Sequence, residues 1–176
     1  MMISQDIKKQ IHVIKMLLLD VDGVLTRGSI IYTDKAEEVK IFSVKDGLGL
    51  RLLMDAGIQV GIVTGRTSKA LLTRCDNLGI TLIFDGIHHK EDVLDTIIQK
   101  TGLGYHEIAF AGDDLPDIRI MKKTGFPIAV ANACPEVRSA ASYITSAQGG
   151  DGAVREISEL ILKTQGLWDK AIHQFL

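Results

Sequence analysis

The sequence predicts an α/β fold: a Rossmann-like parallel sheet with helices on both faces and a small inserted β-hairpin. Short apolar runs alternate with segments of helical periodicity along most of the chain, which is typical of βαβ units. The 176 residues are 46% hydrophobic and 24% charged, which suffices for the core of one domain. We therefore expect a single domain over residues 1–176.

Five apolar runs are the expected strands of the sheet. Each is short and apolar, as expected for strands that are buried on both faces, and the first four are followed directly by a polar residue or glycine. The runs cover residues 16–19, 60–63, 81–84, 108–111 and 126–130.

Helical periodicity fills the segments between these runs. Residues 48–56 and 68–78 are each followed by a glycine, and Gly102 is placed to end a helix that includes residues 93–98. Glycine commonly ends helices because it adopts the left-handed conformation. A C-terminal helix and tail are expected at 153–176, with apolar residues at helical spacing in 154–161.

Residues 29–42 interrupt the alternation. Two short stretches, 29–33 and 38–42, flank a polar turn at 34–37, which predicts a hairpin inserted after the first strand. The insertion is too short to form a domain. Its strand edges and the apolar Ile30, Ile31 and Tyr32 favour pairing between copies of the chain, so we expect a homotetramer assembled through this hairpin.

Composition and charge exclude several classes of function. Twenty basic against 22 acidic residues give a net charge of −2, which disfavours nucleic-acid binding. No window approaches the ~20 apolar residues of a membrane span, and the N-terminal segment lacks the features of a signal peptide. Cys75 and Cys134 form no CxxC pair, so neither a disulfide framework nor a zinc site is expected. We expect a cytoplasmic protein that binds neither membrane nor nucleic acid.

Polar residues follow four of the apolar runs. Because the carboxyl ends of parallel strands meet at one edge of a sheet, where ligands bind, we expect these residues to lie together. They are Asp20 and Asp22 after the first run, Thr64, Gly65 and Arg66 after the second, Lys90 after the third, and Asp113, Asp114 and Asp117 after the fourth.

The acidic residues of this group predict a divalent cation. Two carboxylates about 4 Å apart in a partly screened site repel each other by roughly 4 kcal/mol, so Asp20, Asp22, Asp113 and Asp114 would oppose folding without one. Mg²⁺ suits a site of carboxylates and water. Taken singly, these residues fit turns or helix N-caps better than a site, and Lys90 fits a solvated surface. Their joint occurrence at successive strand ends favours a site.

Four segments carry a family resemblance. Residues 20–26 are DVDGVLT, residues 64–66 are TGR, Lys90 follows, and residues 112–117 are GDDLPD. In type and order they resemble the four motifs of the haloacid dehalogenase-like (HAD) phosphatases, and the resemblance extends from residue 15 to about residue 165. It implies the HAD fold.

Two further segments resemble the small branch of these phosphatases that has no cap domain. They are FSVKDGLG at 42–49 and GGDGAVRE at 149–156. Arg27 and Lys45 depart from the branch, where Asp and Arg are usual. The branch implies tetramerisation through the hairpin and a phosphorylated sugar acid as substrate. Arg66 and the DGLG segment favour 3-deoxy-D-manno-octulosonate 8-phosphate, a lipopolysaccharide precursor, over a nine-carbon sugar acid 9-phosphate.

The resemblance also implies a Mg²⁺-dependent mechanism through an aspartyl-phosphate. Asp20 would attack phosphorus, and Asp22 would protonate the leaving oxygen and then take a proton from water. Thr64 and Gly65, at a helix start, would hold phosphoryl oxygens, and Lys90 would supply positive charge.

Ligands for the ion and the substrate follow from the same resemblance. The ion would be bound by Asp20, Asp113 and the backbone carbonyl of Asp22, with Asp114 as a direct or outer ligand, while Asp117 would orient Lys90. The expected substrate-binding residues are Thr64, Gly65, Arg66, Lys45 and Lys90. The planar guanidinium of Arg66 suits a carboxylate, but solvation of Arg66 and pairing of Lys45 with a nearby acid are equally compatible with the sequence.

A different class of protein also places acids at the ends of parallel strands. In a signalling receiver module the phosphorylated Asp follows the third strand, where Asp85 stands alone in this sequence. The paired acids follow the first strand instead, which favours the enzyme. For the tail from Trp168 to Leu176, the sequence leaves open whether it packs on its own core or on a neighbour's active site.

Overall fold

The computed structural model describes residues 3–176, so residues 1 and 2 of the expected domain lie outside the described part. Within this part, six strands form one sheet in the order β5-β4-β1-β6-β7-β8, and every neighbouring pair is parallel. The strands are β1 (Met16–Leu19), β4 (Gln59–Val63), β5 (Leu82–Phe84), β6 (Ile108–Gly112), β7 (Phe126–Ala129) and β8 (Tyr143–Ile144). The predicted Rossmann-like sheet is confirmed. Only β8 was not expected, because two residues are too few for a periodic pattern.

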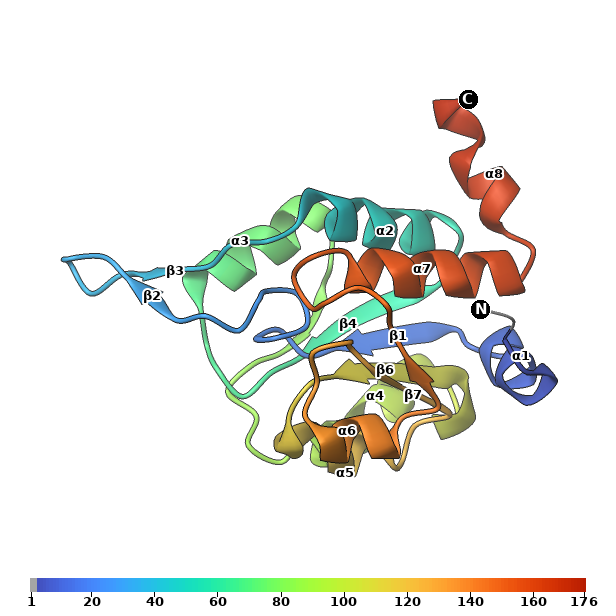
Figure 1. The fold of residues 1–176 in the computed structure, drawn as a ribbon, viewed down its shortest axis with the longest axis horizontal. Helices are drawn as coiled ribbons and strands as arrows, with labels where there is room; N and C mark the ends of the chain where they lie inside the picture. The colour runs from blue at the N-terminus through green and yellow to red at the C-terminus, as the bar shows by residue number, and fades with distance from the viewer. Residues whose placement is uncertain (1–2) are drawn as a thin grey trace.

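Helices cover both faces of this sheet, as predicted (Figure 1). One layer contains α2 (Val44–Asp55), α3 (Lys69–Leu78) and α7 (Ala153–Thr164), and the other contains α4 (Val93–Thr101), α5 (Ile118–Met121) and α6 (Pro135–Ala140). The first helix, α1 (Gln5–His12), lies where the strands begin, and α8 (Trp168–Ile172) follows α7. Short 3-10 turns are η1 (Lys90–Asp92), η2 (Tyr105–Glu107), η3 (Leu115–Asp117) and η4 (His173–Phe175).

The start of α2 differs from its prediction. The helix begins at Val44 rather than at residue 48, because the Ser43 side chain accepts a hydrogen bond from the Asp46 backbone N–H (3.3 Å) and caps the first turn. Gly47 and Gly49, in the first two turns, obscure the helical pattern in the sequence. The buried carboxylate of Asp46 in turn accepts from the backbone N–H of Gly152 (3.3 Å) and of Arg155 (2.8 Å), so α2 also caps α7.

The predicted hairpin is present but shorter than expected. Its strands are β2 (Ile31–Tyr32) and β3 (Glu38–Val39), which pair in antiparallel fashion. The hairpin projects from the body of the molecule beyond the end of the sheet where β1 finishes (Figure 1). No cap domain accompanies it in the described residues, as the sequence predicted.

The core forms where the apolar runs were recognised. All four residues of β1 and all five of β6 are buried, because both strands lie inside the sheet and both of its faces are covered by helices. In residues 3–176 no helix has the length and apolar character needed to cross a membrane.

The C-terminal tail packs on its own chain at its start. The Trp168 ring lies near the cations of Arg155 (5.6 Å) and Lys163 (4.7 Å) of α7, whereas Phe175 and Leu176 are exposed. The first half of the tail therefore belongs to the fold of this chain.

Candidate active site

The residues predicted to form a site meet at the carboxyl ends of β1, β4 and β6. Leu19, the last residue of β1, pairs with Ile62 on one side and Ala111 on the other, so the segments that follow the three strands start at the same level. They line a hollow of about 390 Å³. Its lining includes Asp20, Asp22, Thr64, Gly65, Arg66, Lys90, Asp113, Asp114 and Asp117.

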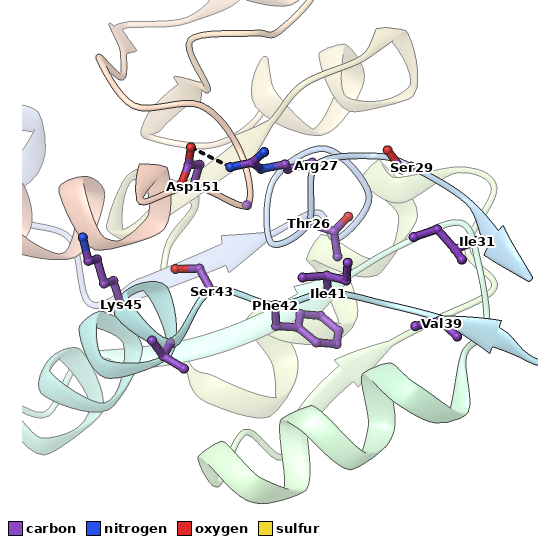
Figure 2. A pocket seen from close by; sticks show the side chains of 12 residues that line it. Thr26, Arg27, Ser29, Ile31, Val39, Ile41, Phe42, Ser43, Lys45 and Asp151 are labelled. Carbon is purple, nitrogen blue, oxygen red and sulfur yellow. Dashed lines mark hydrogen bonds and ion pairs between the residues drawn. The ribbon is translucent and has the colours of Figure 1, made fainter.

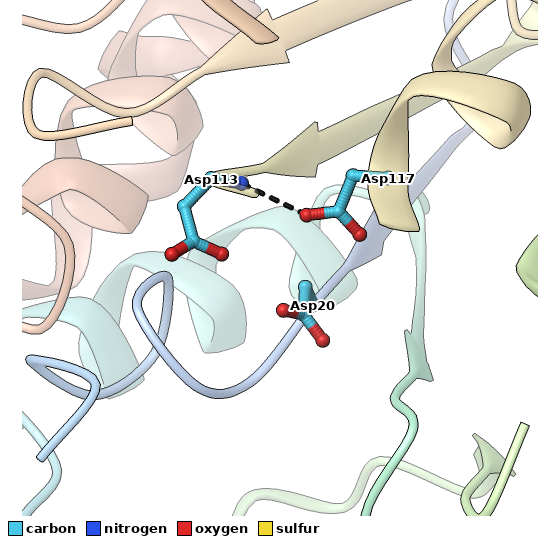
Figure 3. Close-up of side chains that lie close together, drawn as sticks. All are labelled: Asp20, Asp113 and Asp117. Carbon is cyan, nitrogen blue, oxygen red and sulfur yellow. Dashed lines mark hydrogen bonds between the residues drawn. The ribbon is translucent and has the colours of Figure 1, made fainter. Parts of the chain in front are cut away.

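Three carboxylates form the centre of this hollow (Figure 3). Asp20, Asp113 and Asp117 each place an oxygen within 4.8 Å of the others. Asp117 Oδ2 accepts hydrogen bonds from the backbone N–H of Asp113 (2.9 Å) and of Asp114 (3.3 Å), which fixes the turn after β6. Asp113 Oδ1 is buried and has no hydrogen-bond partner in the part of the chain that the structure describes. An unsatisfied buried oxygen in an acidic group is what a bound cation would satisfy.

The turn after Asp22 makes room for this group. Gly23 has a φ of +93°, and a Cβ there would lie 1.9 Å from Asp113 Oδ2. Gly149, far away in sequence, packs against the same turn so closely that a Cβ on it would lie 1.6 Å from the carbonyl oxygen of Gly23. The Gly150 N–H donates to the carbonyl of Val24 (2.8 Å). The loop before α7 thus completes the turn that follows the first strand.

Burial and mutual repulsion change the acidity of these carboxyls. Burial, reinforced by the charges of Asp20 and Asp117, raises the pKa of Asp113 to about 8. Burial and the charge of Asp117 raise the pKa of Asp20 to about 6, although Lys90 opposes the shift. Ionising the whole group at neutral pH therefore requires added positive charge.

Lys90 supplies part of that charge from η1, after β5. Only 4% of the residue is exposed, which excludes the solvated surface position that the sequence left open. Its Nζ lies 2.7 Å from Asp20 Oδ1 and 2.6 Å from Asp117 Oδ1. Burial opposes the charge of Lys90, but these two carboxylates outweigh it and raise the pKa of the ammonium above its ordinary value. Lys90 is thus a cation held against Asp20.

Thr64 and Gly65 lie on the opposite side of β1 from Asp113. Thr64 is buried at the end of β4, its carbonyl accepts from Ile87 N–H (3.0 Å), and its Oγ1 accepts from Arg66 N–H (3.4 Å). Within residues 3–176 the Thr64 hydroxyl donates no hydrogen bond, so its proton is available to a ligand oxygen. The expectation that Gly65 starts a helix was wrong, because α3 begins only at Lys69 and the Gly65 N–H belongs to the preceding bend.

Asp22 lies in a second network that sequence reasoning missed. Its Oδ1 accepts from Lys40 Nζ at 2.5 Å, and Lys40 also lies 3.2 Å from Glu38 Oε1. The guanidinium of Arg66 donates to Glu38 Oε1 (2.8 Å). Partial burial of Glu38 opposes ionisation, but the hydrogen bond and charge of Lys40 lower the pKa of this carboxyl. One pattern in the sequence could have indicated this network. Glu38 and Lys40 alternate with apolar Val39 and Ile41, so their side chains lie on the same face of the strand, which here faces Asp22.

Two predicted residues lie apart from the central group. Asp114 Oδ1 accepts from Leu115 N–H (2.8 Å) and caps η3, so its carboxylate is not among the three that converge. Lys45 does not line the hollow that contains Asp20. It lies on a separate groove of about 430 Å³ between the base of the hairpin and the start of α2, beside the ion pair of Arg27 with Asp151 (2.9 Å; Figure 2).

Comparison with known proteins agrees with this geometry. The profile of the haloacid dehalogenase-like hydrolases matches residues 80–157. The 3-deoxy-D-manno-octulosonate 8-phosphate phosphatase KdsC of Escherichia coli (strain K12) is 40% identical over 169 residues, covering 96% of this chain and 90% of that protein. The chain belongs to this phosphatase family.

Solved structures of the octulosonate 8-phosphate phosphatase family share the fold. The Moraxella catarrhalis enzyme, crystallised with a magnesium ion, a phosphate ion and KDO, superposes with a TM-score of 0.95 at 42% identity and covers 97% of this chain and 98% of its own. The cobalt-bound enzyme of Haemophilus influenzae gives 0.86 at 41% identity, over 89% and 92% of the two chains. Membership of the family confirms the resemblance inferred from the motifs, and the receiver interpretation loses its basis because Asp85 does not line the hollow.

Proposed function

We propose that this chain is a Mg²⁺-dependent phosphatase that hydrolyses 3-deoxy-D-manno-octulosonate 8-phosphate to the free sugar acid and phosphate. The observation that carries the proposal is the contact of the Asp20 carboxylate with buried Lys90 (2.7 Å), next to Asp113 and two residues before Asp22. A carboxylate whose charge is stabilised by a buried ammonium, at a site that can also take a divalent cation, is suited to attack phosphorus. Relatives that share about 40% of their residues with this chain bear the name of that phosphatase.

The donor set fits Mg²⁺. Asp20 and Asp113 are hard oxygen donors close together, and Asp113 Oδ1 has no hydrogen-bond partner among the described residues. These two carboxylates would hold the ion together with the backbone carbonyl of Asp22, and Asp114 would act directly or through water. When bound, the ion offsets the negative charge of the carboxylates and of the phosphoryl group.

The side chains of the chain divide the reaction into two steps. Asp20 attacks phosphorus, a bond from its carboxylate oxygen forms, and the bond to the sugar oxygen breaks as Asp22 donates a proton to that oxygen. In the second step Asp22 takes a proton from water, which attacks phosphorus and releases phosphate while Asp20 regains its carboxylate. Thr64 and Gly65 hold phosphoryl oxygens, and Lys90 offsets charge that develops on them.

A panel of phosphate esters tests this function. We expect kcat/KM to be highest for 3-deoxy-D-manno-octulosonate 8-phosphate, lower for a nine-carbon sugar acid 9-phosphate, and lowest for phosphate esters of neutral sugars. Arg66, two-fifths exposed at the rim of the hollow, is the candidate group for the substrate carboxylate. Equal turnover of acidic and neutral sugar phosphates would contradict the proposed substrate, and failure to release phosphate from any ester, aryl phosphates included, would contradict the phosphatase.

We also propose that the enzyme is a homotetramer assembled through the 29–42 hairpin and that it works in the cytoplasm in lipopolysaccharide precursor synthesis. The hairpin exposes Tyr32 (61%) and Ile41 (69%), and an apolar groove lies at its base (Figure 2). Both cysteines are free thiols, as is usual in a reducing compartment.

Light scattering measures the assembly directly. We expect a mass near four times the chain mass of 19.2 kDa, and a smaller species for Ile41→Asp, which places a charge on the exposed face of the hairpin. A fully active monomer would contradict the tetramer.

A further inference from the structure

The two carboxylate oxygens of Asp22 have different surroundings. Oδ1 is 2.5 Å from Lys40 Nζ, and this is the only hydrogen bond that the Asp22 side chain accepts from the described residues. Oδ2 is buried and has no hydrogen-bond partner among residues 3–176, with the Arg66 Nε at 3.5 Å. One oxygen is therefore anchored, and the other is left for a group that enters the hollow.

Lys40 reaches Asp22 from the hairpin and is held firmly. It follows β3 directly, and its side chain is only 3% exposed although the hairpin itself is mostly solvent-facing. A buried ammonium needs compensating charge, which Asp22 and Glu38 (3.2 Å) provide. Glu38 is fixed in turn by Arg66 (2.8 Å).

Within residues 3–176, the other cations near the site are engaged elsewhere or lie farther from Asp22 than Lys40 does. Lys90 is engaged with Asp20 and Asp117, and Arg66 directs its closest contact to Glu38. Among residues 3–176, Lys40 is thus the group that fixes the orientation of the Asp22 carboxylate.

We propose that Lys40 is a positioning residue for proton transfer: it anchors Asp22 through Oδ1 so that Oδ2 faces the oxygen of the leaving group. This inference rests on the proposed phosphatase function, in which Asp22 protonates that oxygen. It also gives the hairpin a role in the active site of its own chain, because Lys40 directly follows β3.

The dependence of the rate on the leaving group tests this role. An ester whose leaving oxygen is strongly basic needs the proton, whereas 2,4-dinitrophenolate leaves without it. The kcat/KM reports the steps up to departure of the leaving group. For Lys40→Met we expect kcat/KM to fall about 100-fold on the sugar acid phosphate and on phenyl phosphate, and less than about 3-fold on 2,4-dinitrophenyl phosphate.

Matched variants separate positioning from loss of charge or structure. Lys35→Met removes a cation from the exposed turn of the same hairpin and should keep the wild-type kcat/KM on every ester. Lys40→Arg should recover part of the loss. In an Asp22→Asn background Lys40→Met should have no further effect on phenyl phosphate, because the anchored carboxylate is gone.

Each outcome decides the inference. An equal loss on all three esters, or additive losses with Asp22→Asn, would overturn it. If circular dichroism shows that Lys40→Met is unfolded, Lys40→Gln takes its place, and its loss of kcat/KM on phenyl phosphate is compared with its loss on 2,4-dinitrophenyl phosphate. Absence of phosphate release by the wild-type protein would instead refute the phosphatase function, which separates the two failures.

Discussion

Asp20→Asn is expected to abolish phosphate release, lowering kcat by at least about 10³-fold. The amide cannot form the acyl-phosphate bond, and no other carboxylate can replace it, since Asp117 is engaged by Lys90 and by the backbone after β6. Steady-state phosphate release measures the effect.

The fold of this variant should survive. Asp20→Asn removes one carboxyl from a group in which burial raises the pKa, so Tm without metal should equal or exceed that of the wild type. Asp6→Asn, on α1 at the other end of the sheet, is the matched control and should be fully active. Near-normal turnover by Asp20→Asn would remove Asp20 from the role of nucleophile.

Removal of Mg²⁺ is the second large effect. EDTA should lower phosphate release by about 10²-fold or more, and excess Mg²⁺ should restore it, because the clustered carboxylates and the phosphoryl group otherwise repel each other. A protein that is indifferent to chelation would contradict the metal site.

The same removal should change how stability depends on pH. Asp113 has a pKa of about 8 in the folded chain and Asp20 about 6, against an ordinary value of 3.8. Between these values the native protein binds more protons than the unfolded chain, so the free energy of unfolding without metal falls as pH rises from 3.8 to about 8. The Tm of EDTA-treated protein should therefore fall across this window more steeply than that of Asp113→Asn, and Mg²⁺ should raise Tm most at pH 8. If Mg²⁺ raised Tm by the same amount at pH 5 and at pH 8, the raised pKa values of Asp113 and Asp20 would be contradicted.

The strands and their polar ends could be predicted because both depend on local sequence. A strand inside a covered sheet is apolar throughout, and the residues that follow it reach the ligand-binding edge. The convergence of Asp20, Thr64, Lys90 and Asp113 follows from that rule. Two-residue strands such as β8 lie below the length at which periodicity can be recognised.

Contacts between segments could not be predicted in the same way. Lys40 is one of several charged residues on a short hairpin, and only the path of the chain after β3, back toward the body of the molecule, brings it to Asp22. Lys45 carries the same charge five residues later but lies on the first turn of α2, facing another groove. The direction of the backbone decides which site each of these lysines reaches, and the residue type alone does not predict that direction.

The contact of Gly149 with Gly23 joins the loop before α7 to the turn that follows Asp20. A chain that ends before residue 149 lacks the contact that supports that turn. The Asp46 carboxylate then has no N-terminus of α7 to cap. A chain truncated before residue 149 should therefore release no phosphate, although Asp20, Thr64, Lys90 and Asp113 are all still present in it.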